Sequence, residues 1–180
     1  MKNLLTKLCF QVVALPLRFK GVKFGTDVRI GPSYDLFGVC QTNVFLGDCV
    51  EIGRRAWIQT LSVTDGHISI GSRTSIGRDV VISSAARIAI GDDCMLSYRV
   101  SIIDHDHSFC LGKGPSKNDV DERTPVSIGD RTFVGANTTI LKGVTIGSDC
   151  IIGANSVVTT NVPNGTITAG NPAKVLRIRT

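Results

Sequence analysis

The chain has 180 residues, of which 42% are hydrophobic, 19% are charged and only 6% are aromatic. This balance predicts one folded domain with an aliphatic core and excludes a disordered chain, while the 19 glycines argue against a helical bundle. The net charge of +5 lies within residues 1–26, because residues 27–180 carry 15 basic and 15 acidic residues, so no nucleic-acid partner is expected.

Residues 1–21 are predicted to form an amphipathic helix followed by a linker. Hydrophobic residues recur on one helical face of residues 2–15, and Pro16 then ends the helix. Two roles fit this helix. It can cap the open end of the fold that follows, which we expect to be its main role, and residues 1–20 can make weak peripheral contact with an anionic membrane surface. No apolar run of 18 residues and no signal-peptide cleavage site are found, so we expect a cytoplasmic protein, at most peripheral to the inner membrane face.

A six-residue repeat follows this predicted helix and linker. Six is a multiple of two, the period of a β-strand, and not of 3.6, the period of an α-helix. Three hexapeptides would form one coil in which equivalent positions stack as three internal ladders, and Gly beside a corner would permit a backbone geometry that a side chain would obstruct. Gly follows nine of the fifteen aliphatic residues of the repeat, which are Leu46, Ile52, Ile58, Ile70, Ile76, Ile82, Ile90, Leu96, Ile102, Ile128, Val134, Ile140, Ile146, Ile152 and Val158.

The longest break in the repeat, residues 104–125, is polar and rich in Gly, Pro and Asp, and we expect it to protrude from the coil as a functional loop. Two of the three histidines, His105 and His107, stand at its start. Imidazole can take a proton from a hydroxyl near neutral pH, and the flanking carboxylates could fix its tautomer or raise its basicity. The six cysteines show no CxxC spacing and are expected to be reduced thiols, with Cys110 of the loop not a nucleophile.

Three further segments, Pro125–Gly129, Phe133–Ala136 and Ala169–Arg177, complete a pattern that resembles the hexapeptide-repeat acyltransferases, in particular the sugar and polysaccharide O-acetyltransferases. The resemblance covers residues 22–177. It implies an all-β catalytic domain over these residues, a left-handed parallel β-helix from which residues 104–125 protrude. It also implies a homotrimer that transfers an acetyl group from acetyl-CoA to a sugar hydroxyl, and we expect a role in the biosynthesis of a bacterial surface polysaccharide.

The same resemblance assigns roles to individual residues. It implies that His105 is the general base and that Asp79 contacts the acceptor. We also expect Asp104 and His107, which flank His105, to contact the sugar or glycolipid acceptor. Two positions depart from the family pattern: Phe133 stands where Trp is usual, and Thr160 replaces a Lys of the galactoside enzymes and so removes one phosphate partner. The residues implied to bind coenzyme A are Phe133, Ala136, Ala154, Thr159, Thr160, Lys174 and Arg177.

Two other classes of protein remain as alternatives. β-Helical carbonic anhydrases bind zinc with three histidines, and the spacing of His105 and His107 can place two imidazoles on one metal ion. The third histidine, His67, lies two coils earlier, however, and the spacing of the paired histidines is wider in that family, so no metal is expected. A non-catalytic β-helical scaffold is the second alternative, but a bare scaffold has no need of the loop at residues 104–125.

Overall fold

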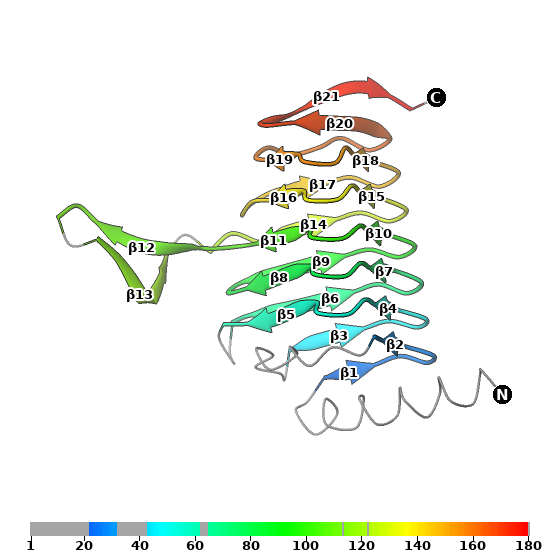
Figure 1. Ribbon diagram of the computed structural model, residues 1–180, viewed down its shortest axis with the longest axis horizontal. Coiled ribbons are helices and arrows are strands. Elements are labelled where there is room, and N and C mark those ends of the chain that lie inside the picture. Colours follow the sequence, from blue (N-terminus) through cyan, green and yellow to red (C-terminus); the bar gives the residue numbers. More distant parts are fainter. Residues whose placement is uncertain (1–21, 32–42, 62–64, 113, 122, 180) are drawn as a thin grey trace.

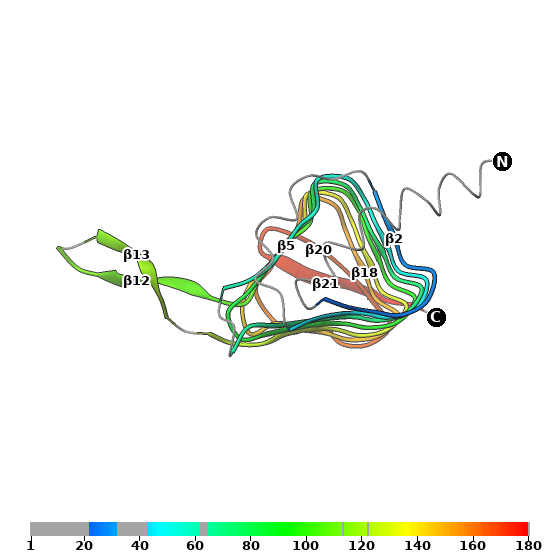
Figure 2. The ribbon, with the colours of Figure 1, turned by 90° about the horizontal axis from the view of Figure 1, so that it is seen from below.

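The computed structural model describes residues 22–31, 43–61, 65–112, 114–121 and 123–179. Three sheets form the sides of a triangular parallel β-helix (Figures 1 and 2). The first face consists of β1 (Lys23–Phe24), β3 (Val44–Leu46), β6 (His67–Ile70), β9 (Arg87–Ile90), β14 (Val126–Ile128) and β17 (Thr145–Ile146). The second consists of β2 (Arg29–Ile30), β4 (Glu51–Ile52), β7 (Ser75–Ile76), β10 (Met95–Leu96), β15 (Phe133–Val134), β18 (Ile151–Ile152), β20 (Thr166–Gly170) and β21 (Ala173–Ile178). The third consists of β5 (Trp57–Thr60), β8 (Val81–Ser84), β11 (Ser101–Ile103), β16 (Thr139–Ile140) and β19 (Val157–Val158).

The chain turns a corner after each face, and one strand from each face makes one coil. Strands β1 and β2 belong to coil 1. The complete coils are coil 2 (β3–β5), coil 3 (β6–β8), coil 4 (β9–β11), coil 5 (β14–β16) and coil 6 (β17–β19). The third corner follows the third face and includes residues 104–125. The first corner comprises residues 47–49, 71–73, 91–93, 129–131 and 147–149, and the second comprises residues 53–55, 77–79, 97–99, 135–137 and 153–155.

The predicted repeat is confirmed in the core. All fifteen aliphatic positions are buried, with exposed fractions of 5% or less. The parallel pairing stacks them as expected: Ile70 pairs with Ile90, and Ile90 pairs with Ile128 across the long break. Burial of aliphatic surface in three ladders therefore stabilises the coil, at roughly 25 cal/mol for each Å² removed from water. No helix occurs among the described residues, and the helix predicted for residues 1–21 lies outside them.

Glycine is required at the corners because successive coils approach closely. A Cβ added to Gly135 would lie 2.5 Å from the backbone nitrogen of Ala154 in the next coil, and one added to Gly53 would lie 2.6 Å from that of Arg78. Contacts this short demand a backbone shift. The left-handed backbone conformation falls instead on the third residue of the corner, where side chains are tolerated, as at Arg55 and Asn137 (φ 57° at both).

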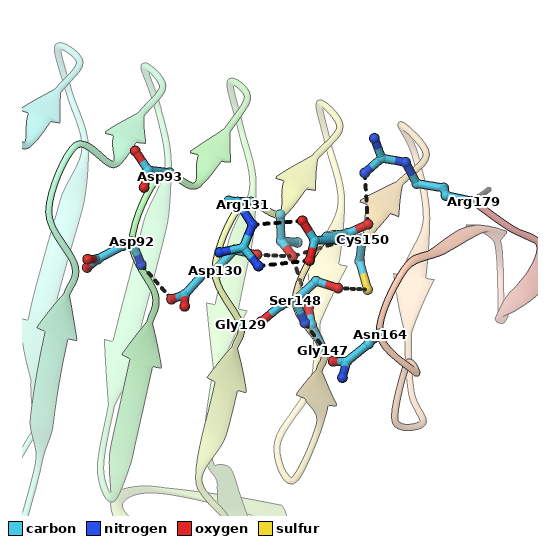
Figure 3. Close-up of polar contacts among 12 residues, drawn as sticks. Asp92, Asp93, Gly129, Asp130, Arg131, Gly147, Ser148, Cys150, Asn164 and Arg179 are labelled. Carbon is cyan, nitrogen blue, oxygen red and sulfur yellow. Dashed lines mark hydrogen bonds and ion pairs between the residues drawn. The ribbon is translucent and has the colours of Figure 1, made fainter.

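A ladder of polar side chains joins the coils at the first corner. The Asp92 amide donates to the Asp130 carboxylate at 2.9 Å, and the Ser148 amide donates to the side-chain oxygen of Asn164 at 2.8 Å (Figure 3). Each side chain thus satisfies a backbone donor of the coil before it. Beside this ladder, Arg131 binds the Asp149 carboxylate through two nitrogens, both at 2.8 Å. This corner is held by hydrogen bonds and ion pairs rather than by apolar packing.

Two segments leave the parallel coil. Residues 104–125 protrude as expected and contain an antiparallel hairpin, β12 (Asp106–Cys110) and β13 (Gly114–Asp121), which we call the arm (Figures 1 and 2). At the C-terminal end, beyond the last aliphatic residue of the repeat at Val158, β21 pairs antiparallel with β20. Strand β21 folds back on β20 and does not start another coil, so an antiparallel hairpin ends the stack.

The first corner predicts how stability depends on pH. Hydrogen bonds from Arg131 and Arg73 hold the pKa values of Asp149 and Asp93 below the ordinary value of 3.8. A carboxyl with a lowered pKa in the folded state stabilises the fold above its unfolded pKa, and the contribution disappears as pH falls through the folded pKa. The melting temperature should therefore be level near neutral pH and fall below about pH 4. In Asp149→Asn the fall should be shallower, and an unchanged acid limb in this variant would contradict the assignment.

Candidate active site

His105 lies at the third corner, where coil 4 gives way to the arm. It follows β11, which pairs with β8 below and β16 above. The two ends of the loop are held together, because the Thr124 amide donates to the Asp104 carbonyl at 2.9 Å and the Gly143 amide donates to the Thr124 carbonyl at 3.0 Å. The backbone around His105 is thus fixed to the coil although the arm extends away from it.

Asp104 is fully buried beneath this corner. Its carboxylate accepts hydrogen bonds from the Ser84 hydroxyl at 2.7 Å, the Ala85 amide at 2.7 Å and the Ala86 amide at 3.0 Å. These donors belong to the third corner of coil 3. A buried carboxylate must be hydrogen-bonded, and the coil below provides the donors that satisfy it.

The same carboxylate contacts His105. The Nδ1 atom lies 3.1 Å from an Asp104 oxygen, and the His105 side chain is 7% exposed. An ionised carboxylate only accepts hydrogen bonds, so Nδ1 carries the hydrogen and Nε2 is the nitrogen that can take a proton. The His107 ring stands edge-on to His105, with ring centroids 6.2 Å apart, and is exposed.

Two ion pairs fix the base of the arm. Lys142 of the coil above pairs with Asp106, and Arg123 at the end of the loop pairs with Asp65 at 3.3 Å. They tie the arm to the coils on both sides of His105. Neither pair was predictable from the sequence, because each joins exposed or half-buried side chains of residues far apart in the chain.

The burial of Asp104 disagrees with the expected contact to the acceptor. Its oxygens already accept four hydrogen bonds from the protein, and none of its surface is open to a sugar. The geometry instead suits a residue that orients His105. The sequence shows that carboxylates flank His105 on both sides, at Asp104 and Asp106. Only the structure shows that Asp104 turns inward whereas Asp106 is exposed.

Asp79 lies apart from His105 within one chain. It belongs to the second corner, at the start of the third face, whereas His105 follows the end of that face. Five extended residues span roughly 16 Å. The Asp79 carboxylate is bound by Arg55 at 2.6 and 2.9 Å, and this hydrogen-bonded pair holds its pKa below the ordinary value.

The residues expected to bind coenzyme A lie on the upper coils, at the second corner, at the third corner and on the second face. Ala136 and Ala154 stack at the second corner, where the Asn155 amide donates to the Ala136 carbonyl at 2.8 Å. Lys174 lies along the same edge. It pairs with Ala169 on β20, and the Ala169 Cβ would lie 2.7 Å from a Cβ added to Gly153 of the second corner. The remaining positions are exposed: Thr159 and Thr160 at the third corner after β19, Arg177 on β21, and Phe133 on the outside of the second face.

The described residues include no group of three His, Cys, Asp or Glu side chains arranged to hold a metal ion. His67 lies on the first face with its ring 5.0 Å from Phe45, and burial followed by the charge of Arg87 lowers its pKa. Cys94 and Cys150 are buried free thiols, and burial raises the pKa of Cys94, which makes that thiol a poor nucleophile. No helix among the described residues is long and apolar enough to cross a membrane.

Several known proteins resemble this chain. A profile of the hexapeptide repeat of succinyl-transferase matches residues 125–160. YvoF of Bacillus subtilis is 30% identical over 130 residues, which cover 69% of this chain and 67% of YvoF. Galactoside O-acetyltransferase of Escherichia coli is 30% identical, over 70% of this chain and 62% of that enzyme. Rv3034c of Mycobacterium tuberculosis is 34% identical over 72% of this chain, which spans only 44% of that protein.

Solved structures of acyltransferases share the fold of this chain. A single-residue mutant of AntD, an N-acyltransferase from Bacillus cereus in complex with dTDP and coenzyme A, superposes with a TM-score of 0.72 at 20% identity, over 92% of this chain and 89% of that one. At that identity the likeness concerns the fold. The hexapeptide-repeat acetyltransferase VCA0836 from Vibrio cholerae is 32% identical over 63% of both chains, with a TM-score of 0.56. Repeat, fold and relatives therefore establish that this chain belongs to the family of hexapeptide-repeat β-helical acetyltransferases.

Proposed function

We propose that this protein transfers an acetyl group from acetyl-CoA to a hydroxyl of a sugar, with His105 as the general base. The observation that carries the proposal is the buried Asp104–His105 pair at the root of the arm, with Nδ1 on the carboxylate and Nε2 left for the hydroxyl proton. The 30% identity to Galactoside O-acetyltransferase supports a sugar acceptor. A zinc site would need a group of metal-binding side chains that the described residues do not bring together.

The chain's own residues provide for proton transfer. Nε2 of His105 takes the proton as the sugar oxygen attacks the thioester carbonyl, and Asp104 stabilises the imidazolium that forms. When bound, acetyl-CoA supplies the activated acyl group. Collapse of the tetrahedral adduct breaks the carbon–sulfur bond, and the proton on Nε2 passes to the departing sulfur, which returns His105 to its starting state. No covalent intermediate on the protein is required.

The upper coils fit the donor. Ala154 is exposed and Ala136 is half-buried at the second corner, and their small side chains leave room for a narrow chain such as pantetheine. Lys174 and Arg177 are exposed cations on the last hairpin, where they can bind the phosphates of coenzyme A. Phe133, Thr159 and Thr160 line the adjoining surfaces in this proposal.

Loss of His105 should remove the base. His105→Ala should lower kcat by about two to four orders of magnitude, as expected for a lost general base, while binding of coenzyme A persists. The products of acetyl-CoA and a panel of sugars would be measured by mass spectrometry, which also separates O- from N-acetylation. His107→Ala is the matched control, because His107 has no contact with Asp104 and its loss should cost less. A larger loss in His107→Ala would reassign the base.

Loss of the Asp104 charge should change the tautomer of His105. In Asp104→Asn the new amide can donate to Nδ1, which places the hydrogen on Nε2 and blocks proton uptake, so kcat should fall by about two to four orders of magnitude. Nitrogen NMR of the imidazoles reads the tautomer directly, and the chain has 3 histidines to assign. Ser84→Ala, which removes one hydrogen bond from the same carboxylate without changing its charge, should keep the tautomer and lose much less activity. The idea fails if Asp104→Asn keeps the wild-type tautomer and melting temperature.

We further propose that the active form is a homotrimer whose sites lie between subunits. The distance across the third face separates Asp79 from His105 in one chain, and the outside of the second face exposes Met95 (53%) and Phe133 (38%). Sedimentation at assay concentrations should show a trimer. A fully active monomer would overturn the shared site.

A further inference from the structure

The charges of the coil are separated between its corners. The first corner contains five carboxylates and two arginines, whereas the second corner contains four arginines and one carboxylate. The sequence count of 15 basic and 15 acidic residues after residue 26 conceals this separation. We call the basic part of the second corner, on coils 2 to 4, the arginine corner; it comprises Arg54, Arg55, Arg78, Asp79, Tyr98 and Arg99.

We propose that the arginine corner binds the diphosphate group of an activated acceptor, a sugar attached to a nucleoside diphosphate or to a lipid diphosphate. The identity of the ligand as a sugar acceptor rests on the function proposed above. The binding of a diphosphate at this place rests on the structure of the corner alone.

The arginines lie on three successive coils. The Asp79 amide donates to the Arg54 carbonyl at 3.1 Å, and the Arg99 amide donates to the Arg78 carbonyl at 3.0 Å. Adjacent strands in such stacks are about 4.8 Å apart, so guanidinium groups from neighbouring coils can reach the two phosphoryl groups of one diphosphate. Arginine is suited to this ligand because its planar fork binds phosphate oxygens through two nitrogens.

Among the described residues, the arginine corner contains one carboxylate, that of Asp79. Asp79 is bound by Arg55 through both oxygens, and the Arg78 Nε lies 4.0 Å away. Arg54 and Arg99 pair with no carboxylate among the described residues. At the first corner, in contrast, Arg73 and Arg131 each bind a carboxylate of the following coil at 2.6 and 2.8 Å. The arginine corner is therefore an exposed cluster with excess positive charge, which attracts anions.

An aromatic ring completes the site. Tyr98 is 44% exposed, and the Arg78 guanidinium lies 5.5 Å from its ring centroid. A ring held beside a cation in this way can stack on a nucleobase or a sugar ring while the arginines bind the phosphates. The combination favours a diphosphate that carries a ring over inorganic phosphate.

The arginine corner ends at coil 4, the same coil from which His105 extends. Along the same edge, Tyr98 and Arg99 of coil 4 are followed by Ala136 and Asn137 of coil 5. This change from large cationic to small side chains occurs where His105 leaves the coil, so the acceptor diphosphate would lie below that level and the donor above it. Because the third face is wider than one sugar ring, the arginine corner serves the His105 of a neighbouring copy in the proposed trimer.

The test measures binding without acetyl-CoA, on the full chain, by calorimetry. The probes are inorganic pyrophosphate, UDP, GDP, and vesicles that contain a polyprenyl diphosphate. Arg78→Gln and Arg99→Gln should each weaken binding of the preferred probe at least tenfold. Arg73→Gln, a paired arginine of the first corner, is the matched control and should leave binding unchanged. Tighter binding of UDP or GDP supports a nucleotide-linked acceptor, and tighter binding of the vesicles supports a lipid-linked one.

Asp79→Asn gives a test of opposite sign. Removal of the Asp79 charge should tighten pyrophosphate binding several-fold, because a competing anion is lost from the arginines. Unchanged pyrophosphate affinity in this variant and in both arginine variants would overturn the proposal, as would dissociation of the oligomer in the arginine variants, which would make these residues interface contacts. Pyrophosphate binding in a protein without transferase activity would refute the proposed function alone, whereas transfer that is indifferent to the arginine variants would refute this inference alone.

Discussion

The requirement that equivalent residues of successive coils stack in contact governs the whole structure. Stacking places the aliphatic residues in three buried ladders, and it demands glycine wherever the backbone of the next coil occupies the place of a Cβ, as at Gly53 and Gly135. The same stacking brings polar side chains of one corner within hydrogen-bonding distance of the amides below, as Asp130 and Asp92 show. A regular core therefore carries chemically distinct edges along its length.

The candidate base depends on this stacking. Asp104 lies above the corner of coil 3, where Ser84 and two amides supply the donors that a buried carboxylate needs. His105 then receives a fixed orientation from a residue adjacent in sequence, but one held in place by residues about twenty positions earlier. The arm can extend from the coil without loosening this pair, because ion pairs at Asp106 and Arg123 hold its base.

The edges of the coil separate the two substrates in the proposed reaction. At the second corner, arginines of the lower coils give way to alanines of the upper coils, and His105 leaves the third corner at the same level. The second corner would thus bind an anionic acceptor on its lower coils and a thioester donor on the coils directly above. A repeat fold achieves this by changing side chains at a single corner position from coil to coil, with no change in the backbone.

The sequence alone determined the coil, because a six-residue aliphatic period with adjacent glycines is compatible with few other folds, and it placed the arm and His105 at the same break. It could not determine that Asp104 turns inward or that Asp79 lies among arginines. Corner residues lie outside the six-residue hydrophobic pattern, so that pattern does not constrain their side chains. Their partners are 18 to 24 residues away, at a spacing set by the length of each coil. Only the stacked structure decides which of these side chains meet.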